Sequence, residues 1–120
     1  MTITLPYPPS VNHYWRKFRN HMVISAEGRA YRAAVWAAVV EQGCPLYAEG
    51  ALALKIKAWM PDKRRRDLDN ILKALLDAMQ DAGLYEDDSQ VSRIEIERMG
   101  VEPPGRVEVE IEPQTGKGKP

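Results

Sequence analysis

The chain has 120 residues, of which 44% are hydrophobic, so its length suits one domain with a modest core. No apolar run approaches the ~18 residues of a membrane span, and no signal-peptide pattern opens the chain, so we expect a cytoplasmic protein with no membrane partner. The formal net charge is zero and Cys44 is the single cysteine, which excludes an intrachain disulfide and a Cys-rich zinc site.

The first part of the chain predicts a strand, a basic segment and a helix. Residues 3–5 form a short strand that ends at the proline-rich stretch 6–9, because proline has no backbone donor. Residues 12–21 form an irregular segment rich in aromatic and basic side chains. Ser25 is a favourable N-cap for a helix that runs to about Gln42, where glycine and proline follow.

The second part predicts a strand, a helix and two more strands. Apolar residues alternate over 51–60, which indicates a strand whose outer side is basic. Apolar spacing from Leu68 to Met79 predicts an amphipathic helix that closes at Gly83. Residues 94–97 and 107–111 alternate as well, and the turn Pro103-Pro104-Gly105 joins them in antiparallel directions.

These elements follow the order β-α-β-α-β-β. We therefore predict an α/β (α+β) fold in which two helices accompany a small mixed sheet of about four strands. Residues 1–112 form the single domain, and residues 113–120 are expected to be a disordered polar tail.

Charge is distributed unevenly along the chain, which indicates a nucleic-acid surface in a chain without net charge. Residues 1–66 carry 11 Lys/Arg and 4 Asp/Glu, whereas residues 67–120 carry 6 and 13. The two halves meet at four consecutive cations that directly precede Asp67 and Asp69; the cations are Lys63, Arg64, Arg65 and Arg66. Cations of this kind neutralise DNA phosphates, and paired carboxylates suit Mg²⁺. The alternatives are a solvated surface run and, for Asp67, a helix cap.

Two further features extend this candidate site. Glu86-Asp87-Asp88 lies in the loop before a strand, where its carboxylates could converge with Asp67 and Asp69 around a divalent ion. Lys73 follows Asp69 by one helical turn, so it either stabilises charge that develops on a phosphate or forms an ordinary surface pair.

The segment near residue 15 interleaves aromatic rings with cations, a pattern suited to phosphate contact and base stacking. The alternative is a loop whose aromatic rings pack on the core. The nucleic-acid-binding candidates in this segment are Asn12, Tyr14, Arg16, Lys17 and Arg19.

With these residues in view, the chain resembles the RusA family of Holliday-junction resolvases over roughly residues 3–112. The matching pieces, in the order and spacing of the family, are Leu5-Pro6-Tyr7-Pro8-Pro9-Ser10-Val11-Asn12, Ser25-Ala26-Glu27-Gly28, Ala30-Tyr31-Arg32, Met60-Pro61-Asp62, Arg64-Arg65-Arg66-Asp67-Leu68-Asp69-Asn70 and Asp87-Asp88-Ser89-Gln90-Val91. Their combination is far more specific than any single piece.

The resemblance implies a homodimeric, Mg²⁺-dependent endonuclease, with Mn²⁺ as a substitute metal, that nicks four-way DNA junctions on two opposed strands in recombination and repair. By motif position it assigns the essential carboxylates to Asp67, Asp69 and Asp88, and the functional lysine to Lys73. A two-fold dimer would supply the two symmetric cuts. Competing hypotheses are an endonuclease for other branched DNA, a non-catalytic DNA-binding module, and an interaction protein that uses the acidic face of the sheet.

Overall fold

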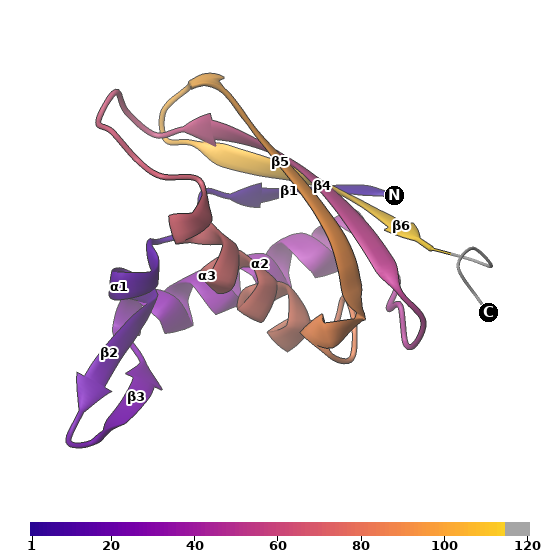
Figure 1. The fold of residues 1–120 in the computed structure, drawn as a ribbon, viewed down its shortest axis with the longest axis horizontal. Helices are drawn as coiled ribbons and strands as arrows, with labels where there is room; N and C mark the ends of the chain where they lie inside the picture. The colour runs from indigo at the N-terminus through magenta and orange to yellow at the C-terminus, as the bar shows by residue number, and fades with distance from the viewer. Residues whose placement is uncertain (115–120) are drawn as a thin grey trace.

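The computed structural model describes residues 1–114 as a four-stranded mixed sheet with helices packed on one face (Figure 1). The sheet order is β1-β6-β4-β5, formed by β1 (Thr2–Pro6), β6 (Arg106–Pro113), β4 (Leu52–Met60) and β5 (Val91–Val101). Strand β4 runs parallel to β5 and antiparallel to β6. The prediction of a small mixed α+β sheet is therefore confirmed.

The bounds of the two long helices agree closely with those predicted from the sequence. Helix α2 (Ala26–Gln42) begins after Ser25, whose hydroxyl accepts a hydrogen bond from Gly28 N–H at 2.9 Å, and ends at Gly43 with φ of 66°. Helix α3 (Asp69–Asp81) lies beside α2. Neither of these helices nor any other within residues 1–114 is long and apolar enough to cross a membrane.

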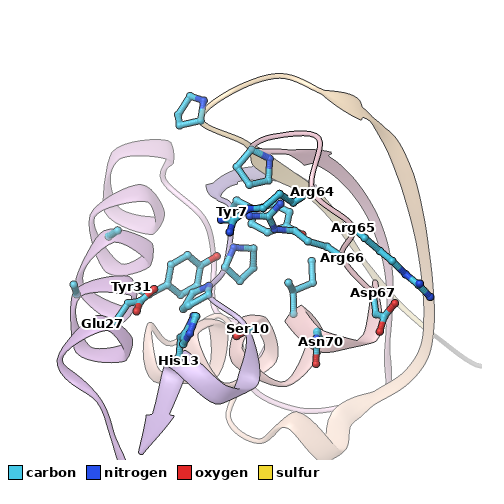
Figure 2. Close-up of a pocket in the computed structure, with 17 residues that line it drawn as sticks. Tyr7, Ser10, His13, Glu27, Tyr31, Arg64, Arg65, Arg66, Asp67 and Asn70 are labelled. Atoms are coloured by element: carbon cyan, nitrogen blue, oxygen red, sulfur yellow. The ribbon is translucent and has the colours of Figure 1, made fainter.

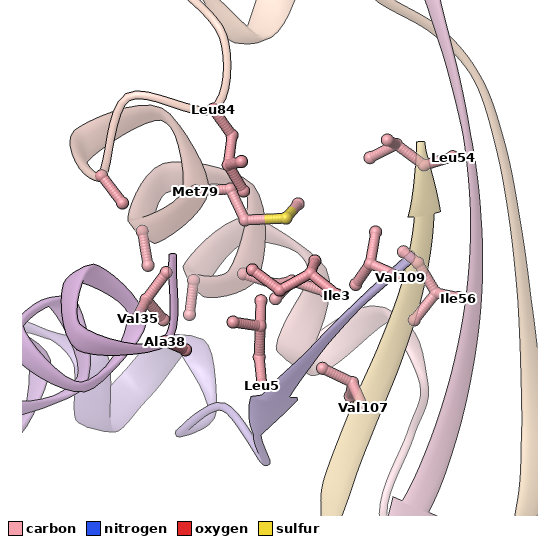
Figure 3. Packing of buried hydrophobic residues seen from close by; sticks show 14 of the residues in the cluster. Ile3, Leu5, Val35, Ala38, Leu54, Ile56, Met79, Leu84, Val107 and Val109 are labelled. Atoms are coloured by element: carbon pink, nitrogen blue, oxygen red, sulfur yellow. The ribbon is translucent and has the colours of Figure 1, made fainter. Parts of the chain in front are cut away.

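The core lies between α2, α3 and one face of the sheet (Figure 3). Alternate residues of each covered strand point inward and are buried, as period-2 alternation requires. They include Ile3 and Leu5 from β1, Leu54 and Ile56 from β4, and Val107 and Val109 from β6.

The outer face of the sheet is charged but balanced. The strand register sets Lys55 opposite Glu110 and Glu95, and sets Lys57 opposite Glu108 and Glu97. Opposite charges on facing positions stabilise a sheet modestly. The lysines thus offset part of the acidic face, which weakens the hypothesis of a basic protein partner there.

Three predictions need correction. The strands near residues 94–97 and 107–111 do run in opposite directions, but β4 lies between β5 and β6, so they are not neighbours. Pro113, placed in the tail, ends β6, and Gln114 N–H donates to the Ala51 carbonyl at 2.8 Å. The rest of the predicted tail, residues 115–120, lies outside the described residues.

The third correction concerns residues 12–21, which are regular rather than irregular. A single helical turn, α1 (Val11–Tyr14), leads into a separate antiparallel hairpin of β2 (Trp15–Phe18) and β3 (His21–Ile24). This hairpin projects away from the sheet (Figure 1). A short 3-10 helix, η1 (Asp88–Gln90), precedes β5 and was also not predicted.

The base of the hairpin is held against the start of α2. Ser25 N–H donates to the Tyr14 carbonyl at 2.9 Å, and the Ser25 hydroxyl donates to the same carbonyl at 3.0 Å. Gly28 permits this approach, because a Cβ there would lie 2.4 Å from the Tyr14 carbonyl oxygen and 2.7 Å from Ile24. The hairpin therefore leaves the domain from a fixed point.

Replacing Gly28 by alanine is expected to lower the free energy of unfolding by about 1–3 kcal/mol, because the added methyl overpacks this contact. Urea unfolding measures the loss. Gly100→Ala is the matched control, since its Cβ would meet nothing within 4 Å and should change stability by less than about 0.5 kcal/mol. Equal stability of the two variants would contradict the role given to Gly28.

Candidate active site

Asp62 organises the basic loop that connects β4 to α3. Its carboxylate accepts a hydrogen bond from Arg64 N–H at 2.9 Å and forms an ion pair with Arg66. The hydrogen bond from Arg66 is the main reason that the pKa of Asp62 is lowered to about 2. The Arg66 carbonyl in turn accepts from Arg98 of β5 at 2.8 Å. Arg66 is thus largely structural.

The other three cations of the loop are free to meet an anion. Lys63, Arg64 and Arg65 are all exposed. The Arg64 side chain retains 81% of its accessible surface, against 24% for Arg66, and its only ion pair with another residue of 1–114 is a 3.5 Å contact with Asp62. An exposed pair of this length is weak, so a phosphate can replace it.

Asp67 and Asp69 follow this loop and are exposed. The N-cap of α3 is Leu68, and no side chain within residues 1–114 caps this helix, so the alternative of Asp67 as a helix cap does not hold. Within residues 1–114, neither aspartate side chain accepts a hydrogen bond or forms an ion pair. Two unpartnered carboxylates at a helix N-terminus are therefore available to a ligand.

Lys73 is also exposed and forms no ion pair with any residue of 1–114, so the surface pair with Asp69 is not formed. The other candidate partner, Asp77, is engaged elsewhere. It accepts hydrogen bonds from Arg32 at 2.7 Å and from the Tyr14 hydroxyl. Arg32 neutralises Asp77, so the charge of Lys73 remains available to a ligand.

This network shows that Tyr14 was assigned wrongly to the nucleic-acid surface. Its side chain is fully buried, and burial, followed by the hydrogen bond to Asp77, raises the pKa of its hydroxyl. The core-packing alternative holds for this residue. By contrast, Asn12, Arg16, Lys17 and Arg19 are exposed, and the Arg16 and Arg19 guanidinium groups stack on Phe18 at 5.4 and 5.3 Å.

The two aspartates that precede β5, Asp87 and Asp88, have different surroundings. Asp87 caps η1 by accepting from Ser89 N–H at 2.9 Å, and this hydrogen bond lowers the pKa of Asp87. The Asp88 side chain has no such partner within residues 1–114, which fits its choice as the functional member of the pair.

Asp88 lies near the C-terminal end of α3, whereas Asp69 begins the helix. Its backbone N–H donates to the Gln80 side chain at 2.9 Å. Gln80 follows Asp69 by eleven residues, or roughly 16 Å of helix. Among residues 1–114, no three His, Cys, Asp or Glu side chains are grouped as a metal site. One chain therefore does not bring the three predicted carboxylates together.

A cavity of about 700 Å³ opens beside Asp67 (Figure 2). The basic loop and Asn70 form one side, and Glu27 and Tyr31 of α2 form the other. The Tyr31 hydroxyl donates to the Pro6 carbonyl at 2.7 Å, which holds the proline-rich stretch against α2. The sequence did not lead us to assign Glu27 and Tyr31 to the site, although both belong to pieces of sequence that match the RusA family.

The fold and this site define an endodeoxyribonuclease: residues 6–112 match the family model described as Endodeoxyribonuclease RusA. The chain belongs to the RusA family. It is 47% identical over 111 residues, 91% of each chain, to the crossover junction endodeoxyribonuclease of Enterobacteria phage 82. Identity is 43% over 107 residues (89% of each) with that of phage HK97, and 42% over 110 residues (92% of each) with that of Escherichia coli K12.

Proposed function

We propose that this protein is a crossover junction endodeoxyribonuclease that resolves four-way (Holliday) DNA junctions in recombination and repair. The observation that carries the proposal is the placement of exposed, unpartnered Asp67 and Asp69 directly after a loop of exposed cations. The cations bind the phosphates of the DNA, and the carboxylates act on the phosphodiester bond that is cut. A protein with this substrate works in the cytoplasm beside the DNA.

The carboxylates fit a divalent metal ion. Mg²⁺ takes oxygen ligands and is usually bound through one or two carboxylates, waters and substrate phosphate. Asp67 and Asp69 offer such oxygens and have no competing partner within residues 1–114. When bound, Mg²⁺ or its substitute Mn²⁺ supplies charge neutralisation at the phosphate and lowers the pKa of water. Asp88 is the third proposed ligand.

A homodimer explains how Asp88 joins the other two aspartates. A two-fold axis near the middle of α3 exchanges the ends of the two copies, and so sets Asp88 of the partner subunit beside Asp67 and Asp69. The exposed edge strand β5 carries Ile94, Met99 and Val101 with 38%, 41% and 43% exposure, which is apolar surface suited to a partner. The two carboxylate sites of such a dimer would make the paired, symmetric nicks.

The remaining candidates bind DNA or stabilise the transition state. Lys73 supplies a cation to the phosphate as negative charge develops there. The exposed cations of the basic loop and the hairpin hold the arms of the junction, together with Asn12; they are Lys63, Arg64, Arg65, Arg16, Lys17 and Arg19. Arg66 supports the loop.

The test is cleavage of a synthetic four-way junction with Mg²⁺ and with EDTA, followed by mapping of the nicks. Symmetric nicks that require metal support resolution. Cutting of flaps and forks in preference to junctions would favour a nuclease for other branched DNA. Metal-independent binding without cleavage would leave a DNA-binding module, and no salt-sensitive DNA binding at all would favour a protein partner.

Replacing Arg64 and Arg65 by alanine should weaken junction binding and flatten its salt dependence. Each lost phosphate contact reduces the log–log slope by about 0.9, so the double variant should lose about 1.8. Lys55→Ala with Lys57→Ala is the matched control on the outer face of the sheet, and its slope should equal that of the wild type. If the two double variants give the same slope, DNA does not contact the basic loop.

A further inference from the structure

A second cavity, of about 550 Å³, lies between the hairpin and α3. This volume falls within the range of about 300–1,000 Å³ that small-molecule sites occupy. It is separate from the cavity beside Asp67 and shares no residue with it. Its lining residues are Val11, Asn12, Trp15, Arg16, Lys17, Met22 and Lys73.

The lining combines an apolar surface with a cationic border. Val11, Trp15 and Met22 are apolar, and Met22 remains 63% exposed, so its side chain is accessible to a ligand. Asn12 adds an amide that can both donate and accept. Arg16, Lys17 and Lys73 bring three positive charges to the same opening. A bare phosphate would not use the apolar part, and an apolar peptide would not use the cations.

Trp15 contributes its ring to the lining of the cavity. Its indole N–H is the one buried side-chain nitrogen or oxygen within residues 1–114 that has no hydrogen-bond partner. Burying an unpaired donor costs free energy, and nearly all such groups in proteins are paired. The ring is held by edge-to-face contact with Tyr14 at 5.1 Å, and because the N–H is buried it does not open into the cavity, so Trp15 offers a ligand its ring surface rather than its donor.

A flat aromatic base attached to an anionic phosphate matches both the apolar lining and the cationic border of this cavity. We propose that this cavity holds the base of an unpaired nucleotide at the branch point of the junction. Trp15 and Met22 contact the base, while Arg16 and Lys17 hold its phosphates. Base contacts of this kind do not depend on sequence, because every base has a π-face.

The place of Lys73 links the cavity to the reaction, so this inference rests on the proposed function. Lys73 lines the cavity and is the cation proposed for the cleaved phosphate. A base held there would belong to a nucleotide next to that phosphate. A base pair at the branch point lacks the continuous stacking of unbroken duplex DNA and costs less to open, so the cavity favours branched DNA and aligns the bond to be cut.

The hairpin is built to hold such a base in place. The hydrogen bonds of Ser25 and the close approach of Gly28 fix its lower end on α2. Trp15 and Met22 belong to its two strands, β2 and β3, and Arg16 pairs with Val23 across them. Base and phosphate contacts thus come from one fixed element.

The test combines loss of the base from the DNA with substitution of a side chain that lines the cavity. Junctions are prepared with a single abasic site at each nucleotide in turn on either side of the mapped nick, and binding and single-turnover cleavage are measured for each. With the wild type, loss of the base at one of these positions should weaken binding about 5- to 10-fold, the lower part of the range for a stacked base. Met22→Ala should cause a similar loss on the intact junction.

The two losses should not add when they are combined, because each removes the same contact. Met22→Ala should therefore bind intact and abasic junctions about equally. Phe18→Ala is the matched control, since Phe18 is exposed on the same hairpin but does not line the cavity. Its effect should be the same on both DNAs.

Independent, multiplying losses for Met22→Ala and the abasic site would overturn the proposal, as would a wild type that is insensitive to every abasic position. Cleavage of the intact junction by the wild type is read in the same experiment. If it fails, the proposed function fails. If it succeeds without coupling between Met22 and the base, only the cavity is assigned wrongly.

Discussion

Asparagine in place of Asp67, Asp69 or Asp88 is expected to abolish junction cleavage while junction binding stays intact or improves. Each change removes a proposed metal-binding charge and also some repulsion of DNA, yet keeps the size of the side chain. All three residues are exposed, so folding should be unaffected. Gel-shift titration and single-turnover cleavage with Mg²⁺ measure the two properties separately.

Asp87→Asn is the matched control for Asp88→Asn. Asp87 caps η1, so its replacement should cost a little stability and leave cleavage within a few fold of the wild type. An active Asp88→Asn beside an inactive Asp87→Asn would show that the functional member of the pair was chosen wrongly.

Mixing inactive subunits tests whether the site is shared. Co-expressed Asp69→Asn and Asp88→Asn chains, carrying different tags, give a heterodimer. If the partner supplies Asp88, one site of this heterodimer has all its wild-type carboxylates, and the enzyme should make single nicks on one strand. If each chain builds its own site, both sites stay defective and the mixture should remain inactive.

Lys73→Ala is expected to slow cleavage on the order of 10²-fold, or about 2.7 kcal/mol, while junction affinity is nearly kept. The reason is that Lys73, which forms no ion pair within residues 1–114, is proposed to act on charge that develops in the transition state. A surface pair would be worth only about 0.2–0.5 kcal/mol. Single-turnover cleavage at saturating protein separates the rate from binding.

Lys63→Ala is a suitable comparison, because it also removes one exposed cation near the site. It should weaken binding, reduce the salt slope by about 0.9 and leave the saturated rate nearly unchanged. A Lys73→Ala rate within threefold of the wild type would return Lys73 to an ordinary surface role.

The sequence predicted best those elements whose signals are local. Ser25 and Gly43 mark the ends of α2 because capping chemistry depends on neighbours within one turn. The alternation over 51–60 identified β4 for the same reason. The RusA motifs then led to the proposal that Asp67, Asp69 and Asp88 are the site carboxylates. The structure adds that Asp67 and Asp69 have no side-chain partner within residues 1–114 and that Asp87, not Asp88, is used as a cap.

The features that the sequence did not predict depend on contacts between residues that lie far apart along the chain. The hairpin has strands of only four residues, and its aromatic and basic residues carry no clear alternation. It is fixed by Ser25 and Gly28, which lie beyond it in sequence. Tyr14 could be placed only once Arg32 and Asp77 were seen around its hydroxyl. The insertion of β4 between β5 and β6 is likewise a pairing of distant segments.

The parallel pairing of β4 and β5 has a consequence for how the enzyme is controlled. Helix α3 carries the chain from the end of β4 back to the start of β5, so Asp67 and Asp88 are attached at opposite ends of these two parallel strands. No movement of a loop could unite them within one chain. Under the proposed arrangement a single subunit can bind DNA but not cut it, and at high dilution activity would fall with the square of protein concentration. A lone subunit on the chromosome would then be harmless.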